Sequence, residues 1–348
     1  MNLTRHFIII LASILAGCVT PDITTDGCPA GVEGRPDCPP PEAVADAGLT
    51  EWYEYRAWQS DTVMAQDPIQ RGIEAEIEVQ GARLKLLGTN EQDALYSLAA
   101  KIYLIENAEH SVDAAYYILK DDLVGRAFLG ALCEAVQRGV DVRLMVDSLG
   151  SISIDRKVLR ALYHCQLQAG YIRNLEGQLT TERARVQVVI FNAVSNVFTN
   201  PNRRSHDKLL VVDGFAPEKA FVMTGGRNMS LSYYGINADG SPNPDTYLDA
   251  ELLLRPGERQ VEGHTVSHIS EIYFSLLYSY QNNLYLDARV PANGRSAYPE
   301  LEGSLKESLA TLKALAPMAA SLEAMPEYLN SGYRDGKVRL AHEFGNLV

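Results

Sequence analysis

Apolar positions in the middle of the chain alternate as in a strand, then recur with helical spacing, and then alternate again. Residues 111–118 alternate between apolar and other side chains, which predicts a strand, and residues 140–147 do the same. Between them, apolar residues recur with helical spacing up to Arg138, two aspartates favour the helix start, and Gly139 favours its end. A strand, a helix of this length and a second strand predict a parallel crossover unit.

Further elements extend this unit on both sides. Residues 91–107 have the spacing of a helix with one apolar face. Short apolar runs at 208–212, 220–224 and 250–254 predict strands that are covered on both faces. The sequence therefore predicts an α/β fold in which a mixed, largely buried β-sheet is flanked by helices.

The composition is that of a chain that folds around a core. Of the 348 residues, 46% are hydrophobic and 22% are charged, which excludes wholesale disorder, collagen and coiled coil. The formal net charge is −13, so the surface repels polyanions on average. This balance argues against a protein that coats nucleic acid, and no nucleic-acid partner is expected.

The N-terminus has the features of an export signal. Arg5 is followed by an apolar run at 7–15, which is too short to span a bilayer permanently and fits a cleaved signal. The four residues that end in Cys18 resemble the lipobox of bacterial lipoproteins. The resemblance implies a signal peptide over 1–17 and a lipid on the Cys18 sulfur; the alternative is an ordinary signal peptide with a chance cysteine. Val19, in place of aspartate, implies an outer-membrane lipoprotein that faces the periplasm.

A flexible linker is expected between this anchor and the folded part. Residues 18–48 are rich in Pro, Gly, Asp and Thr and have no hydrophobic period. Cys28 and Cys38 flank a short loop there, and they either pair in an oxidising compartment or stay free thiols. The folded domain is expected over residues 49–290.

The candidate chemistry lies in the segment SHDKLLVVDG, which begins at Ser205 and fits the pattern H-x-K-x-x-x-x-D. His206 and Lys208 are two residues apart on a predicted strand, so their side chains leave the same face, at a separation that one phosphate bridges. A neutral imidazole can attack phosphorus while the ammonium offsets the phosphate charge. Asp213 has the opposite parity and is expected to support the local fold more than to touch substrate.

Two later segments add groups that suit a phosphate. The strand at 220–224 is followed by a Gly-Gly-Arg-Asn turn. Gly226 lets the backbone approach a ligand closely, and the Asn228 amide can donate hydrogen bonds to a phosphate oxygen. Asp249, before the next strand, offers a carboxylate that can hold the His206 ring and stabilise the imidazolium.

Together these segments resemble the phospholipase D superfamily of phosphodiesterases. The shared features are the H-x-K-x-x-x-x-D box, the Gly-Gly-x-Asn turn, the acidic residue before the following strand, and the upstream crossover unit. The resemblance implies that His206 forms a phosphohistidine, which water or an alcohol then releases, without a metal or another cofactor. The catalytic set is then His206, Lys208, Asp213 and Asp249, and the phosphate-binding set is Lys208, Gly226 and Asn228.

The site of this family uses two such boxes that face each other, and this chain has one. Of the seven histidines, only His206 is followed by a lysine two residues later. The missing box leaves three alternatives: a homodimer that shares one site across a two-fold axis, a fragment whose second half lies downstream, or an inactive relative. We favour the fragment, because 305–322 has the pattern of a helix and 336–342 that of a strand at the chain end. Residues 291–348 are then a helix and the start of a truncated second half.

The leading hypothesis is a membrane-anchored phosphodiesterase that hydrolyses or transfers phosphatidyl groups of phospholipids, as cardiolipin synthases do. One alternative is a metal-independent dimeric nuclease of the same superfamily. The other is a non-catalytic envelope lipoprotein that binds phosphorylated head groups. His264 and His268 are four residues apart, but no third ligand accompanies them in the sequence, so no metal site is expected.

Overall fold

The computed structural model describes residues 38–68, 70, 71, 79–193, 203–257, 265–286, 297–341 and 344. The chain divides into two units, Met1–Glu42 and Ala43–Val348, and the second contains the α/β fold. None of the helices in the described ranges is both long enough and apolar enough to cross a membrane. The signal peptide over 1–17 and the lipid on Cys18 lie outside the described residues and stay predictions.

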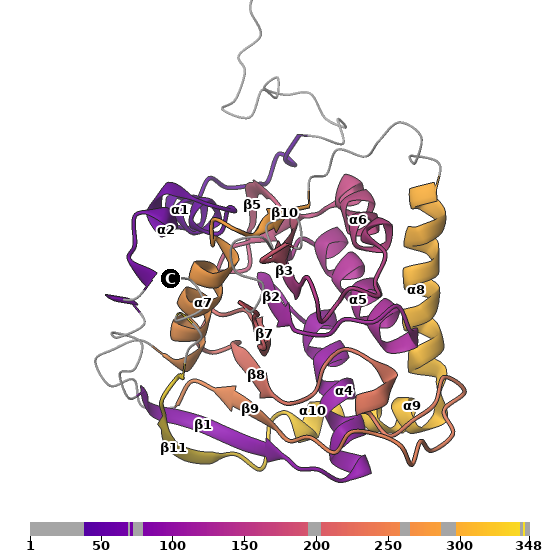
Figure 1. Ribbon diagram of the computed structural model, residues 1–348. Helices are drawn as coiled ribbons and strands as arrows, with labels where there is room; N and C mark the ends of the chain where they lie inside the picture. The colour runs from indigo at the N-terminus through magenta and orange to yellow at the C-terminus, as the bar shows by residue number, and fades with distance from the viewer. Residues whose placement is uncertain are drawn as a thin grey trace, which may run out of the picture. The chain divides into compact units, whose positions relative to one another are not determined.

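A nine-stranded mixed sheet forms the centre of the second unit (Figure 1). Its strands are β1 (Val79–Leu87), β2 (Ser111–Tyr116), β3 (Asp141–Asp147), β6 (Val186–Phe191), β7 (Lys208–Val212), β8 (Phe221–Gly225), β9 (Glu251–Arg255), β10 (Leu284–Tyr285) and β11 (Arg334–Val338). Their spatial order is β10-β6-β3-β2-β7-β8-β9-β1-β11. β3 pairs in parallel with β2 and β6, and the other pairs are antiparallel. A separate two-stranded sheet contains β4 (Tyr171–Arg173) and β5 (Leu179–Arg183).

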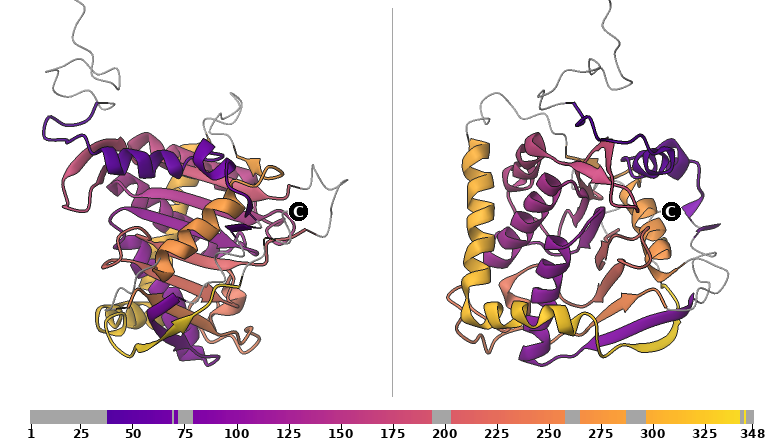
Figure 2. Two further views of the ribbon diagram at one scale, coloured as in Figure 1. Left: turned by 90° about the vertical axis from the view of Figure 1, so that its left-hand side faces the viewer. Right: turned by 180° about the vertical axis from the view of Figure 1, so that it is seen from behind.

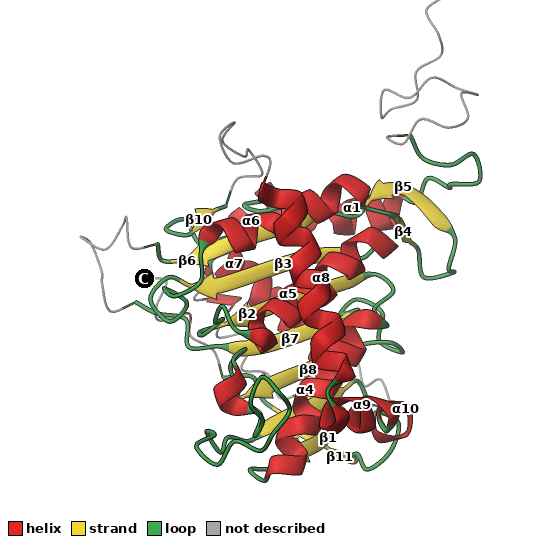
Figure 3. Ribbon diagram, turned by 90° about the vertical axis from the view of Figure 1, so that its right-hand side faces the viewer, coloured by secondary structure: helices red, strands yellow, loops and turns green. Residues whose placement is uncertain are grey.

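Helices cover both faces of the large sheet (Figures 2 and 3). They are α1 (Ala47–Tyr55), α2 (Asp61–Met64), α4 (Glu91–Glu106), α5 (Leu123–Arg138), α6 (Arg156–Cys165), α7 (Val266–Tyr278), α8 (Tyr298–Ala314), α9 (Ala316–Glu323) and α10 (Met325–Tyr328). α4, α5, α6 and α8 lie over one face, and α7 lies over the other. Leu144 and Phe128 belong to the apolar core of the first face, and Met145 and Phe274 to that of the second. The predicted fold class, a mixed and largely buried sheet with flanking helices, is confirmed.

The predicted crossover unit consists of β2, α5 and β3. Asp122 caps α5 by accepting a hydrogen bond from the Gly125 backbone N–H at 3.0 Å. Gly139 ends the helix in the left-handed region, with a φ of 107°, which an L-residue with a side chain rarely adopts. β2 and β3 then pair in parallel, from Ser111 opposite Asp141 onward. The local signals for helix start and stop therefore act where the sequence predicts.

A group of buried charges lies between the sheet and α7, which the apolar pattern does not predict. Arg56 forms ion pairs with Asp113, Asp141 and Glu271 at 2.7, 2.7 and 2.9 Å. Arg143 pairs with Asp113 at 2.6 Å. All five side chains are at most 4% exposed. We call these five residues the buried ion network, in which opposite charges compensate one another inside the fold.

A disulfide links two helices that cover the same face of the sheet. It links Cys133 of α5 to Cys165 of α6, whose Cα atoms are 5.4 Å apart. This bond differs from the pairing of Cys28 with Cys38 that the sequence leaves open, and it was not predicted. Cys38 is disulfide-bonded, and Cys28 lies outside the described residues.

The expected start of the folded domain needs a small correction. α1 begins at Ala47, because the Asp46 side chain accepts a hydrogen bond from the Leu49 backbone N–H and caps the helix. The folded unit itself begins at Ala43. The final residues of the expected 18–48 linker are thus part of the fold.

The expected boundary at residue 290 is wrong for the described residues. The helix expected over 305–322 is divided at Leu315 into α8 and α9, because the extended backbone of Leu315 interrupts it and Pro317 starts the next turn. α8 packs on α5 so closely that a Cβ at Gly130 would lie 2.4 Å from the Leu305 carbonyl oxygen. β11 pairs antiparallel with β1 in the large sheet. Residues 297–341 therefore complete this unit rather than begin another.

Candidate active site

The sheet brings the predicted site residues to one of its edges, which we call the site edge. β2, β3 and β8 end at the site edge, and β7 begins there (Figure 1). Tyr116 at the end of β2 pairs with Lys208 at the start of β7. Gly225 ends β8 and leads into the turn that contains Asn228. Strand ends that are distant in sequence therefore converge at one place.

His206 and Lys208 are in direct contact at the site edge. The Nζ atom of Lys208 lies 2.9 Å from Nδ1 of His206 and donates a hydrogen bond to the His206 carbonyl oxygen at 2.7 Å. The Tyr117 ring packs on the imidazole, with ring centroids 4.4 Å apart. His206 is exposed and Lys208 is buried. The strand begins at Lys208 rather than before His206, yet the two side chains still meet.

The surroundings of His206 favour its neutral form. Desolvation and the Lys208 ammonium lower the pKa of His206, while the Asp207 and Asp147 carboxylates raise it; the net shift is downward from 6.5. An ammonium only donates hydrogen bonds, so Nδ1 accepts from Lys208 and the proton of the neutral ring is on Nε2. A neutral imidazole is the form that a nucleophile requires.

The segment before the box is held by the end of β3. The Asp147 carboxylate accepts hydrogen bonds from the backbone N–H groups of Ser205, Leu149 and Gly150 at 3.2, 2.8 and 3.0 Å. Burial raises the pKa of Asp147 despite these bonds. Asp147 is a site residue that was not predicted, although its position as the last residue of a predicted strand is a usable signal.

Asp207, the second residue of the box, is hydrogen-bonded to α7, which covers the other face of the sheet. Its carboxylate accepts hydrogen bonds from the Tyr273 hydroxyl of α7 at 2.8 Å and from the Ser205 hydroxyl at 3.2 Å. Burial raises the pKa of this carboxyl. Asp207 thus attaches the box to α7, a role that the motif leaves open because it allows any residue at this position.

Asn228 lies at the same edge but its amide is already bonded. Its Oδ1 accepts from the Ile118 backbone N–H at 2.8 Å, and its Nδ2 donates to the Tyr233 hydroxyl at 2.9 Å. Burial raises the pKa of Tyr233. Contact of Asn228 with a phosphate stays a prediction, and Tyr233 is a further site residue that the sequence analysis misses.

Gly226 and Asp249 lie against each other beside this turn. The Gly226 N–H donates to the Ala250 carbonyl at 2.9 Å, and a Cβ at Gly226 would lie 2.5 Å from Oδ1 of Asp249. A side chain at residue 226 would therefore displace the carboxylate. The predicted contact of Asp249 with His206 stays a prediction, because Nδ1 of His206 has Lys208 as its partner.

A buried ion pair fixes the strand and the turn on this side. Glu251 binds Lys101 at 2.7 Å and lies 3.5 Å from the Arg227 guanidinium. Both cations are fully buried. Arg227 precedes Asn228 directly, so the contact of Arg227 with Glu251 fixes the position of the turn that carries Asn228.

Asp213, the last residue of the box, lies at the end of β7 that is away from the site edge. Its carboxylate accepts hydrogen bonds from three consecutive backbone N–H groups, at Glu109, His110 and Ser111, the shortest being 2.7 Å. Its φ is 51°, in the left-handed region. Asp213 therefore holds the turn before β2, and the structure does not bring it to His206 and Lys208, with which the expected catalytic set groups it.

Groups of three potential metal ligands are few in the described part of the chain. The one group there that brings three such residues together is Cys133, Cys165 and Glu302, and its two sulfurs form the disulfide. His268 lies on α7, and His264 lies outside the described residues. The expectation of a metal-free site stays a prediction.

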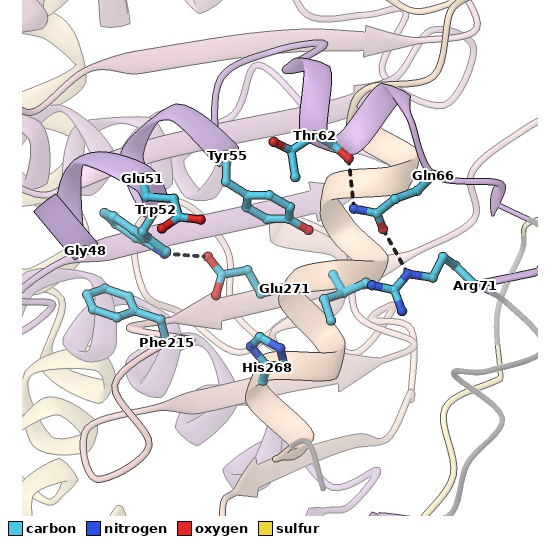
Figure 4. A pocket seen from close by; sticks show the side chains of 11 residues that line it. Gly48, Glu51, Trp52, Tyr55, Thr62, Gln66, Arg71, Phe215, His268 and Glu271 are labelled. Atoms are coloured by element: carbon cyan, nitrogen blue, oxygen red, sulfur yellow. Dashed lines mark hydrogen bonds between the residues drawn. The ribbon is translucent and has the colours of Figure 1, made fainter.

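A cavity of about 400 Å³ lies between α1, α2 and α7 (Figure 4). Trp52, Tyr55 and Phe215 line it together with Glu271 of the buried ion network, to which the Trp52 indole donates a hydrogen bond at 3.2 Å. Phe215 follows β7 at the end opposite Lys208. The cavity is thus away from His206 and does not belong to the candidate site.

Comparison with known proteins adds to this geometry. A family described as "Cardiolipin synthase, PLD-like domain" matches residues 102–239, which include His206, Lys208, Asp213 and Asn228. Residues 102–239 are thus similar to this domain, and they make up less than half of the chain. Asp249 lies beyond the matched residues of this phospholipase D-like domain, so the match adds nothing on its role.

Similar proteins include two cardiolipin synthases. Cardiolipin synthase C of Escherichia coli is 32% identical over 158 residues, which are 42% of this chain and 28% of that protein. Cardiolipin synthase of Geobacillus kaustophilus is 30% identical over 162 residues, which are 46% of this chain and 27% of that protein. The matched part thus spans less than a third of either relative.

Two solved structures overlap with the chain in part. Nuc from Salmonella typhimurium, a phospholipase D family member, has a TM-score of 0.33 at 16% identity and covers 59% of this chain and 97% of its own. Phosphatidylserine synthase of Haemophilus influenzae has a TM-score of 0.39 at 13% identity and covers 79% of this chain and 52% of its own. Both overlaps are weak.

Proposed function

We propose that the chain is a phosphodiesterase of phospholipase D type that hydrolyses or transfers phosphatidyl groups of phospholipids in the bacterial envelope. The contact between His206 and Lys208, inside a phospholipase D-like domain, carries this proposal. The cardiolipin synthases among its similar proteins support a phospholipid substrate.

The first step is attack on phosphorus by Nε2 of His206. The Nε2–P bond forms, the P–O bond to the leaving group breaks, and the leaving alkoxide takes a proton from an acid of the second box. Water or an alcohol then attacks the phosphohistidine, so that Nε2 is released with a phosphate monoester or a new diester. Lys208 and Asn228 offset the charge on the phosphate oxygens.

The hydrogen bond between Lys208 and His206 has a consequence for this step. Nε2 attacks with a lone pair, so the ring proton must move to Nδ1, which accepts from Lys208 in the absence of substrate. A bound phosphate draws the Lys208 ammonium away from Nδ1. The Asp249 carboxylate can then accept a hydrogen bond from Nδ1–H, in the orienting role that the sequence predicts.

The second histidine comes from outside the residues of this box. Either a second copy of the chain supplies it across a two-fold axis, or a further part of a longer protein does. Mass measurement in solution by light scattering distinguishes a dimer from a monomer.

A lipid anchor at Cys18 would place the enzyme beside its substrate. The Cys133–Cys165 disulfide supports an oxidising compartment such as the periplasm. Metabolic labelling with radioactive palmitate tests the anchor, and the label should be lost in a Cys18→Ala variant.

The activity is tested by release of head groups from phospholipid vesicles. We expect the rate to fall to background in His206→Ala and to stay unchanged in His268→Ala, a matched histidine on α7. Acid-labile radioactive phosphate on the protein after substrate addition would identify the phosphohistidine. Equal rates for wild type and His206→Ala would contradict the proposal.

One observation favours a second candidate, a non-catalytic lipoprotein that binds phosphorylated head groups. Only His206 has a lysine two residues later, so the chain has one box where the family uses two. This candidate predicts that binding to vesicles survives His206→Ala, with no turnover at any protein concentration.

A further inference from the structure

Four large apolar side chains at the site edge are open to solvent. Leu149 and Ile152 are 49% and 69% exposed, and Tyr247 and Leu248 are 60% and 62% exposed. Most large apolar side chains of this unit are buried, so exposure of four of them on two loops is a feature to explain. We call these four residues the apolar rim.

The first loop of the apolar rim lies beside the nucleophile. It follows β3, and Gly150 in its middle packs so closely on Tyr117 that a Cβ there would lie 2.8 Å from the Tyr117 ring. The Ser151 hydroxyl donates to the Tyr117 carbonyl at 2.9 Å. The Tyr117 ring also packs on the His206 imidazole. Leu149 and Ile152 are therefore on a loop that is one aromatic ring away from His206.

The second loop lies beside the phosphate-binding turn. Tyr247 packs on Tyr233 with ring centroids 5.0 Å apart, and Tyr233 accepts the hydrogen bond from Asn228. Leu248 precedes Asp249, whose carboxylate touches Gly226. The apolar rim thus reaches both sides of the candidate site, through Tyr117 on one side and Tyr233 on the other.

We propose that the apolar rim inserts into the surface of a phospholipid bilayer, so that the site edge faces the membrane. This inference rests on the proposed function. A phosphodiester held at His206 and Lys208 has its acyl chains within a few bonds of the phosphate. Apolar side chains on both sides of the phosphate then lie where those chains and their bilayer neighbours are. Tyr247 has the amphipathic side chain that is enriched at membrane interfaces.

Apolar contact rather than charge carries this docking. The chain has a net charge of −13, so its average field does not attract an anionic membrane. Docking through the apolar rim should therefore persist when salt is raised to about 0.5 M, where exposed charges are screened within a few ångströms. A second copy of the chain is the competing occupant of the same surface.

Insertion is measured with tryptophan placed on the rim. Full-length Ile152→Trp and Leu248→Trp proteins are bound to vesicles of phosphatidylethanolamine and phosphatidylglycerol with brominated acyl chains, which quench indole on contact. Leu175→Trp is the matched control, because Leu175 is 54% exposed and follows β4, which packs at the start of β3, opposite the site edge. All three proteins carry the same N-terminus, so a lipid anchor affects them equally.

We expect strong quenching at residues 152 and 248 and little at residue 175. In the second arm, Ile152→Ser and Leu248→Ser should each lower turnover of vesicle phospholipid about tenfold, and leave turnover of the soluble diester bis(p-nitrophenyl) phosphate unchanged. Quenching needs no turnover, so it tests the rim even if His206→Ala shows that the proposed activity is absent.

Three results would overturn the inference. Equal quenching at residues 152 and 175 would show that the rim does not face the bilayer selectively. Equal loss of turnover on vesicles and on the soluble diester would place the rim in the catalytic machinery instead. A lower molecular mass of Leu248→Ser in solution would assign the rim to contact with a second copy.

Discussion

The ammonium of Lys208 lies 2.9 Å from the Nδ1 atom of His206. This contact joins the two residues that define the box, and it fixes which ring nitrogen accepts a hydrogen bond. It also means that the positive charge acts on the ring before any phosphate arrives, because the two groups touch.

The first prediction concerns the titration of His206. Desolvation and the Lys208 ammonium both disfavour the imidazolium, so the pKa of His206 lies below 6.5, and the neutral ring is lost only when the pH falls below that lowered value. Lys208→Met removes the nearby positive charge and should raise the pKa. NMR titration of the ring protons, assigned with His206→Gln, measures both values. A pKa that stays the same or falls in Lys208→Met would contradict the electrostatic role of Lys208.

The second prediction concerns Asp213. Asp213→Asn keeps a side chain that tolerates the φ of 51° but weakens the hydrogen bonds to the N–H groups before β2. We expect a loss of about 1–3 kcal/mol in the free energy of unfolding, measured by urea denaturation. Asp239→Asn, on an exposed loop, is the control and should change stability little. If Asp213→Asn is as stable as the wild type, the hydrogen bonds of Asp213 do not stabilise the fold.

The third prediction concerns the buried ion network. Arg56→Met leaves Asp113, Asp141 and Glu271 without their shared cation and should cost about 3–5 kcal/mol of unfolding free energy. Lys219→Met breaks the exposed pair with Glu109 and should cost less than about 1 kcal/mol. Denaturation curves of the two variants compare a buried with an exposed ion pair directly. Similar costs for both would mean that the network adds no more than a surface pair.

The fourth prediction concerns the Cys133–Cys165 disulfide. The bond spans 32 residues, and its removal in Cys133→Ala/Cys165→Ala should cost about 3–4 kcal/mol, because the unfolded chain gains loop freedom. Alkylation and mass spectrometry of the protein, with and without reductant, establish the pairing. In wild-type protein made in a reducing cytoplasm, the Cys133 and Cys165 thiols should react with the alkylating reagent only after unfolding. If the double variant is as stable as oxidised wild-type protein, the expected cost of about 3–4 kcal/mol is contradicted.

Local signals in the sequence predict much of this fold. The crossover unit could be predicted because its start and stop depend on residues within one helical turn, namely Asp122 and Gly139. β7 could be predicted because the four residues that follow Lys208 in it are all apolar. The contact between His206 and Lys208 follows from their spacing, although the strand begins only at Lys208.

The remaining features depend on contacts between distant segments. Arg56 and Asp113 lie 57 residues apart, and an isolated charge in an apolar strand does not reveal its partner. The same holds for the bond between Cys133 and Cys165, since spacing alone does not choose among five cysteines. The pairing of β11 with β1 was also out of reach, because a short exposed strand near the chain end has no apolar pattern that names its neighbour.

The position of β1 between β9 and β11 has a consequence for biosynthesis. Leu84 in β1 pairs with Leu254 on one side and Arg334 on the other. Ribosomes therefore synthesise β1 long before the two strands that pair with it. At the usual pace of about 5–20 residues per second, the gap of about 250 residues keeps one edge of β1 unpaired for roughly 12–50 s. A chaperone that binds extended segments has that interval in which to bind the unpaired edge of β1 and keep it from aggregating.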